Sequence, residues 1–172
     1  MAAARLADRV PFGAASVAAI CEGADVARAT FFLHFPGKPD LLAALAAGLE
    51  APLEAALRGA SPRAAAVLRA LADALFASPG IARWVISAEQ DAGGGRLHAC
   101  VERALCRLSE AGELRRGATP ELLARILLGA AAAVLPSEPG GDRASAQRDA
   151  LLGVLLSGAA EGKPRVKLAA RG

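Results

Sequence analysis

The sequence predicts an all-α protein, with an N-terminal helix-turn-helix head of three helices joined to a larger helical body. Hydrophobic residues make up 54% of the 172-residue chain, but only 3% of it is aromatic. Alanine and leucine supply most of the apolar content, and both favour helices over strands. The length suits one ordinary domain, or a small head attached to a larger body.

The charge of the chain is close to balanced. The formal net charge of +3 permits an anionic partner such as nucleic acid but does not require one. Between Met1 and Leu45, four basic and four acidic residues cancel, so the positive excess lies elsewhere in the chain.

Cysteine usage and hydropathy point to a cytoplasmic protein. Cys21, Cys100 and Cys106 are odd in number and form no CxxC pair, so neither a disulfide framework nor a metal site is predicted. The N-terminus lacks the pattern of a secretory signal, and the longest apolar run, residues 126–135, is too short to span a bilayer. We expect no cofactor and no membrane association.

The head begins with a short helix that ends before Pro11, because the residue before a proline disfavours helical geometry. Ser16 can cap the next helix, which the segment from Gly23 to Asp25 ends. Asp25 is a residue type that tolerates the left-handed conformation of a tight turn. A very short third helix stops before Pro36.

Proline and capping residues mark the starts of the body helices. Pro39 suits the first turn of a helix in which Pro52 should produce a bend or an interruption. Ser61 is predicted to cap a helix that begins at Pro62, and Thr119 to cap another. The predicted helices are residues 1–10, 16–22, 27–33, 39–57, 62–77, 81–88, 97–112, 120–135 and 146–160.

Two short helices joined by a tight turn, with Phe31, Phe32 and Phe35 gathered at the end of the second, indicate a helix-turn-helix. The run I-C-x-x-A-D-V-x-x-A-T-F-F-x-H-F-x-x-K-x-x-L-L then resembles the TetR family of transcriptional regulators, whose pattern reads I-A-x-x-A-G-V-S-x-G-T-L-Y-x-H-F-x-x-K-x-x-L. The residues that fall in register are Ile20, Ala24, Val26, Thr30, His34, Phe35, Lys38, Leu41 and Leu42. The later run AGELRRGATPELLARILLGAAAAVL is similar to the penultimate helix of that family and its lead-in loop.

The resemblance implies a head that enters the major groove of DNA and a body that binds a ligand and dimerises through its last two helices. It divides the chain into a DNA-binding domain (1–45), a ligand-binding and dimerisation domain (46–162) and a basic tail (163–172) that we expect to be disordered. Arg28 is the basic side chain of the presumed reading helix and the leading candidate for reading bases. The residues expected at DNA are Ser16, Arg28, Ala29, Thr30, Phe32, His34 and Lys38.

Several positions depart from the family pattern. Asp25 replaces the usual turn glycine, Ala27 the capping serine and Phe32 the tyrosine, and the first helix is about half as long as the pattern requires. Each change weakens the hold on phosphate. A second hypothesis therefore stays open: a dimeric ligand-binding or protein-interaction module of the same fold that has lost specific DNA binding.

Candidate sites in the body have ordinary alternatives. Large side chains there could line a ligand pocket between helices or simply form the core, and Trp84 is the strongest pocket candidate. Glu89, Asp91 and His98 are expected on the solvated surface, because they straddle a glycine loop without catalytic or metal-ligand spacing. The predicted pocket residues are Phe76, Trp84, Ile86, Leu97, His98, Val101 and Leu105.

Small residues beside leucines in the last two predicted helices allow two copies of the chain to pack closely. The predicted interface residues are Leu122, Ile126, Ala130, Leu151 and Leu155. We expect a homodimeric regulator, a repressor released from its double-stranded DNA operator by a small, largely apolar ligand. An enzyme is not expected, because no nucleophile, base and orienting group occur together at informative spacing.

Overall fold

The computed structural model describes residues 10–61, 63–114, 117, 119–136 and 141–159. The predicted first helix, apart from residue 10, and the predicted tail lie outside these residues. The described residues confirm the all-α prediction. The helices are α2 (Val17–Ala24), α3 (Arg28–His34), α4 (Lys38–Gly59), α5 (Ala64–Phe76), α6 (Pro79–Asp91), α7 (Arg96–Glu110), α8 (Pro120–Val134) and α9 (Gly141–Ala159).

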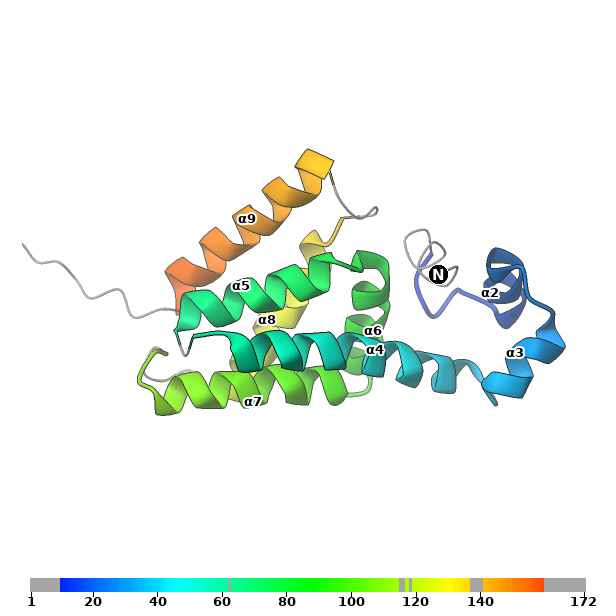
Figure 1. Ribbon diagram of the computed structural model, residues 1–172, viewed down its shortest axis with the longest axis horizontal. Helices are drawn as coiled ribbons and strands as arrows, with labels where there is room; N and C mark the ends of the chain where they lie inside the picture. The colour runs from blue at the N-terminus through cyan, green and yellow to red at the C-terminus, as the bar shows by residue number, and fades with distance from the viewer. Residues whose placement is uncertain (1–9, 62, 115–116, 118, 137–140, 160–172) are drawn as a thin grey trace, which may run out of the picture.

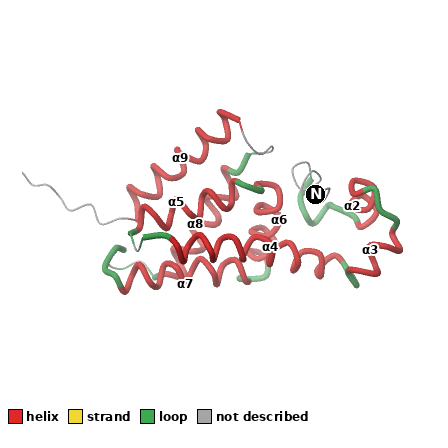
Figure 2. Tube along the Cα trace, viewed as in Figure 1, coloured by secondary structure: helices red, strands yellow, loops and turns green. Residues whose placement is uncertain are grey.

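The helices form a small head at one end of an elongated body (Figure 1). Helices α2 and α3 make the head, and α4 runs from it along the body, where it packs against α5, α6 and α7. Helix α8 packs against α7 and α6, and α9 lies against α5. Figure 2 shows that, besides the segment leading into α2, loops occupy the connections between these helices.

The turn between α2 and α3 forms as the sequence predicts. Ser16 caps α2, because its hydroxyl oxygen accepts a hydrogen bond of 3.1 Å from the Ala19 N–H. Asp25 adopts the left-handed conformation, with φ 53° and ψ 44°. The Val26 N–H then reaches the Cys21 carbonyl and the Asp25 N–H the Glu22 carbonyl, which is the Schellman pattern of a helix end.

Helix α4 continues through Pro52, so the expected interruption is absent. Pro52 cannot donate to the carbonyl of Gly48, four residues earlier. Both residues are exposed, so water can bind the carbonyl that loses its partner. On the opposite side of α4, buried Leu49 and Leu53 hold the helix against the body.

The start of α5 differs from the prediction, because Arg63 rather than Ser61 is its N-cap residue. The Ala64 N–H instead donates to the Glu113 carboxylate, 3.4 Å away just after the end of α7. The cap therefore comes from a residue distant in sequence. Helix α6 also extends beyond the predicted 81–88, and α9 begins before the predicted residue 146.

The body encloses one apolar core. Leu68, Leu105 and Leu128, from three different helices, are each at most 2% exposed within it. Within the described residues, no single helix is long and apolar enough to cross a membrane; α5 and α6 meet those criteria only as a pair bent by 106°.

Glu89 and His98 are buried, which corrects the expectation of a solvated surface at both residues. The Glu89 carboxylate accepts hydrogen bonds of 3.0 Å from the N–H groups of Leu97 and His98, and it lies 3.0 Å from His98 Nδ1. Glu89 therefore caps the N-terminus of α7, where a negative charge is favourable. Gly95 leaves room for this carboxylate, because a β-carbon at Gly95 would overlap it.

We predict that Gly95→Ala destabilises the protein by about 2 kcal/mol, because displacing Glu89 leaves buried N–H groups of α7 without partners. Gly48→Ala is the matched control, since a β-carbon at Gly48 meets nothing within 4 Å and alanine favours helices. Urea unfolding followed by circular dichroism measures both variants. Equal stability of the two would contradict the capping role of Glu89.

Candidate nucleic-acid interface

Helix α3 presents a continuous exposed face. Phe31 points into the head core and is 5% exposed, whereas Arg28, Ala29 and Thr30 are exposed. Helical spacing places Ala29 and residue 33 at the centre of the outer face, opposite Phe31. The face has the form of a helix available to enter a groove.

Leu33 is the residue of this face that the sequence reasoning missed. It is 81% exposed, and its neighbour Phe32 is 48% exposed. Leu33 falls at a variable position of the family pattern, so the motif gave no signal for it. Its place one turn after Ala29 could have revealed it. Together, Ala29 and Leu33 make the centre of the face apolar.

Ser16 and His34 lie at the two ends of this helix pair and are exposed. The Ser16 hydroxyl oxygen already caps α2, but its O–H is still able to donate. Asp25 and Glu22 are exposed at the turn before α3. Arg28 is therefore accompanied by two carboxylates at the same end of the reading helix.

Lys38 has a structural role within the head. Its Nζ donates to the carbonyl oxygens of Phe12 at 2.8 Å, Ala15 at 3.0 Å and Gly13 at 3.2 Å. It also lies 4.6 Å from the centre of the Phe12 ring. An ammonium group has three donors, and all three are used here. A phosphate contact by Lys38 stays a prediction and would require at least one of these bonds to be exchanged.

Helix α3 begins without a side-chain cap. Ala27 occupies the N-cap position and makes no side-chain hydrogen bond. The first N–H groups of α3 therefore remain available to an external acceptor, such as a phosphate oxygen.

Trp84, the strongest pocket candidate in the sequence, packs in the core of the head. It is 1% exposed and packs in one cluster with Ile20, Phe31 and Leu41 of the head. Its indole N–H donates to the Val10 carbonyl at 2.7 Å. A single side chain of α6 thus joins the body to the head.

Among the other predicted pocket residues, only Phe76 lines a space of ligand size in the described part of the chain, a groove of about 320 Å³ between α5 and α9. Ile86, Leu97, Val101 and Leu105 are at most 2% exposed and form the body core, and Phe76 is partly buried against it. A void lined in part by Val101 and Leu105 measures about 10 Å³, about one water-sized probe. His98 is occupied by Glu89.

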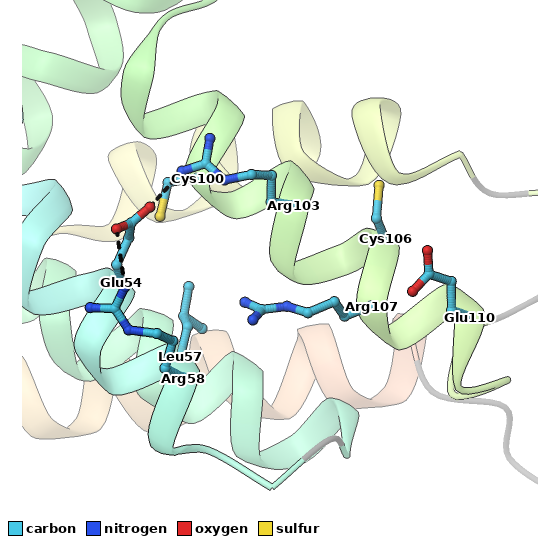
Figure 3. A pocket seen from close by; sticks show the side chains of 8 residues that line it. All are labelled: Glu54, Leu57, Arg58, Cys100, Arg103, Cys106, Arg107 and Glu110. Atoms are coloured by element: carbon cyan, nitrogen blue, oxygen red, sulfur yellow. Dashed lines mark hydrogen bonds and ion pairs between the residues drawn. The ribbon is translucent and has the colours of Figure 1, made fainter.

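A groove of about 400 Å³ lies instead between α4 and α7 (Figure 3). We call it the α4–α7 groove. Sequence reasoning missed it, because it is formed by charged side chains on two helices that are distant in sequence. Its lining residues are Glu54, Leu57, Arg58, Cys100, Arg103, Cys106, Arg107 and Glu110.

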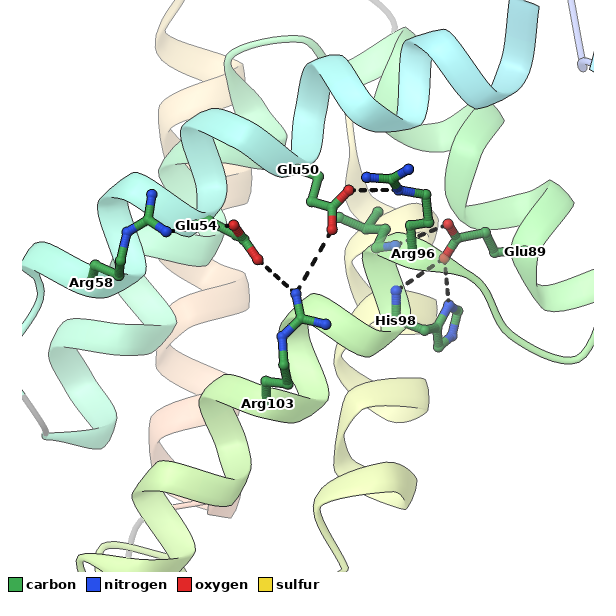
Figure 4. A network of polar contacts seen from close by, with 8 residues as sticks. Glu50, Glu54, Arg58, Glu89, Arg96, His98 and Arg103 are labelled. Carbon is green, nitrogen blue, oxygen red and sulfur yellow. Dashed lines mark hydrogen bonds and ion pairs between the residues drawn. The ribbon is translucent and has the colours of Figure 1, made fainter. Parts of the chain in front are cut away.

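Ion pairs connect the two helices beside this groove (Figure 4). Arg103 of α7 lies 2.6 Å from Glu54 and 3.7 Å from Glu50, both on α4. Arg96 lies 2.7 Å from Glu50. The arginines are more than half exposed, so each pair contributes little alone, but together they fix how α4 lies on α7.

The predicted dimer residues divide into two groups. Leu122 and Ile126 on α8 are each 52% exposed, and Ala130 follows them half-buried. Leu151 and Leu155 are buried in the core of their own protomer, because this side of α9 packs on the body. Val154, which was not predicted, is 69% exposed on α9.

We predict that Asp25→Asn tightens binding of the head to DNA by about fivefold at low salt. A charge about 8 Å from a phosphate costs on the order of 0.5 kcal/mol in water, and a dimer has two such charges. Asparagine keeps the tolerance for the left-handed turn. Fluorescence anisotropy with labelled duplex DNA measures the effect, and Asp91→Asn, exposed far along the chain in α6, is the matched control. Equal tightening by both variants would assign the effect to net charge alone.

Comparison with known proteins agrees with this geometry. Residues 1–45 match the model of the bacterial regulatory proteins of the tetR family. No curated protein sequence matches the chain.

Similar solved structures show the same fold over 90–92% of this chain. The TetR-family transcriptional regulator PfmR from Thermus thermophilus is 18% identical, with a TM-score of 0.60, and the alignment covers 91% of this chain and 96% of that one. A gamma-butyrolactone receptor described as ArpA-like is 19% identical, with a TM-score of 0.65 and coverage of 92% and 84%. A TetR-family regulator from Pectobacterium atrosepticum is 22% identical, with a TM-score of 0.51 and coverage of 90% and 86%. The N-terminal residues 1–45 therefore match the tetR family model, and the chain shares its fold with solved TetR-family transcriptional regulators.

Proposed function

We propose that the chain is a homodimeric, operator-binding repressor that a small ligand with a largely apolar body releases from DNA. The observation that carries this proposal is the exposed face of α3, held by a correctly formed turn and covered by the family match. The family is one of transcriptional regulators, and its members are generally not enzymes.

The exposed face of α3, with Ala29 and Leu33 at its centre, is called the reading face. Its chemistry favours one type of base contact. The apolar centre, Ala29 and Leu33, suits the methyl groups of thymines in the major groove. Arg28, at the start of the helix, can pair with guanine or with phosphate. We propose an operator with thymine at the centre of each half-site.

The exposed apolar residues of α8 and α9 support a dimer. Leu122, Ile126 and Val154 lie on the surface of these helices, where they would contact water in a monomer. Small exposed residues beside them, Gly153 and Ala150 of α9, allow a second copy to approach closely. We propose this surface as the interface in place of Leu151 and Leu155.

The cytoplasm is the proposed location. Cys21, Cys100 and Cys106 are free, as a reducing compartment maintains them.

Loss of specific DNA binding is the competing hypothesis, and two observations favour it. Asp25 places negative charge beside α3, and the ammonium group of Lys38 already donates its hydrogen bonds to carbonyl groups within the head. Under this hypothesis the chain keeps the dimer and the ligand response, but it does not distinguish one DNA sequence from another.

We predict that Arg28→Ala weakens operator binding about tenfold or more, because one base or phosphate contact per head is worth about 1–3 kcal/mol. Selection of bound sequences from a random DNA library supplies the operator, and a gel shift at low salt measures affinity. Arg69→Ala, at an exposed arginine of α5, is the control. If selection yields no enriched sequence, the competing hypothesis holds.

A second experiment tests whether Leu33 contacts the thymine methyl groups. Replacing the operator thymines by uracils removes only the methyl groups, and this change should weaken binding by wild-type protein more than by Leu33→Ala. An equal loss for both proteins would exclude a methyl contact by Leu33.

We predict that Ile126→Asp combined with Val154→Asp converts a dimer into a monomer at micromolar concentration, because two buried unpaired carboxylates from each copy are strongly unfavourable. Size exclusion with light scattering measures the mass. Ala55→Asp, on the exposed side of α4, should leave the dimer intact. A monomeric wild-type protein would exclude the proposed interface.

A further inference from the structure

The α4–α7 groove has an apolar floor. Leu57 and Cys100 are 5% and 2% exposed and lie where the two helices meet. Burial raises the pKa of the Cys100 thiol, so the thiol is neutral at pH 7 and adds to the apolar surface. An apolar group of a ligand could therefore lie on this floor.

The rim of the groove carries three arginines and two glutamates. Glu54 is occupied, because it pairs with Arg103 at 2.6 Å and with Arg58 at 3.6 Å. Arg107 makes no ion pair or side-chain hydrogen bond with the residues that the structure describes. Figure 3 shows its side chain extended across the groove toward Leu57 and Arg58.

An open groove with an apolar floor and an arginine reaching across it favours one class of ligand. A carboxylate pairs with a guanidinium through two parallel hydrogen bonds, and Arg58 adds a second positive charge on the facing helix. The three arginines outnumber the two glutamates of the lining, so a cation would meet a net positive charge, and a neutral molecule would leave Arg107 without a partner among the described residues.

We propose that the α4–α7 groove binds an amphipathic organic anion, with Arg107 holding the carboxylate and Leu57 and Cys100 contacting the apolar part. This inference rests on the proposed function, since it names the chemical class of the ligand that controls the head. The groove lies apart from the predicted pocket residues Ile86, Leu97 and Leu105, which pack in the body core.

Binding in this groove reaches the head through α4. An anion beside Arg58 and Arg103 competes with Glu54 for the same guanidinium groups. An anion that draws Arg103 away from Glu54 removes one of the ion pairs that together hold α4 on α7, and α4 is continuous from the groove to Lys38 in the head. The ligand therefore favours a different position of α4, and through linkage it opposes DNA binding.

The test uses three probes of equal chain length: octanoate, octan-1-ol and octylamine. Isothermal titration of the full-length protein should show octanoate binding about tenfold more tightly than octan-1-ol, and octylamine binding weakest. Arg107→Ala should remove the preference for octanoate over octan-1-ol, whereas the exposed Arg125→Ala of α8 should leave it unchanged. Raising NaCl from about 50 to about 500 mM should weaken octanoate alone.

Three results would overturn the proposal: no saturable binding of octanoate up to about 10 mM, equal affinity for octanoate and octan-1-ol, or an Arg107→Ala variant that keeps the preference. Circular dichroism of the variant confirms folding, which the exposure of Arg107 favours.

A gel shift without octanoate separates this proposal from the proposed function. If wild-type protein binds the operator but octanoate acts equally on wild type and on Arg107→Ala, the groove is excluded as the ligand site and the regulator function stands. If octanoate binding depends on Arg107 but no operator is found, the groove stands as a ligand site and the proposed regulator function is excluded.

Discussion

The burial of Trp84 in the head core is the interaction on which the arrangement of this molecule depends. Helices α2 and α3 are short and offer few large side chains of their own, and units of this size rarely enclose a sufficient core. The indole fills that core from α6, and its N–H closes onto the Val10 carbonyl. Phe12 packs edge-to-face on the same ring, with centroids 5.2 Å apart. The orientation of the head is therefore set by the body and by the course of α4.

The sequence predicts most of the local structure, because the signals are local. Ser16, Asp25 and Thr119 act at helix ends, and each behaves as its chemistry requires. The errors occur where a distant residue decides the outcome. Glu113 caps α5 in place of Ser61, and Glu89 is buried because the N-terminus of α7 lies against it. Neither relation is visible from spacing along the chain.

The candidate DNA-binding face could be predicted from local spacing, whereas the candidate ligand site depends on residues distant in sequence. The reading face follows from the helical repeat around Phe31, apart from Leu33, which the family pattern leaves variable. The ligand site could not be predicted, because large apolar residues line a cavity and a filled core equally well. Trp84 is an example. Its size suggested that it lines a ligand pocket in the body, but it packs in the core of the head. The groove between α4 and α7 depends on side chains that no motif connects.

The position of Trp84 shows that the boundary of sequence similarity and the boundary of the packed core do not coincide in this chain. Residues 1–45 are one unit of sequence similarity, yet the core of that unit is completed by a residue in α6. An isolated N-terminal fragment would expose Ile20, Phe31 and Leu41 where the indole now lies. Grafting this head onto another body would therefore need a large side chain at the corresponding point of the new body to cover these residues.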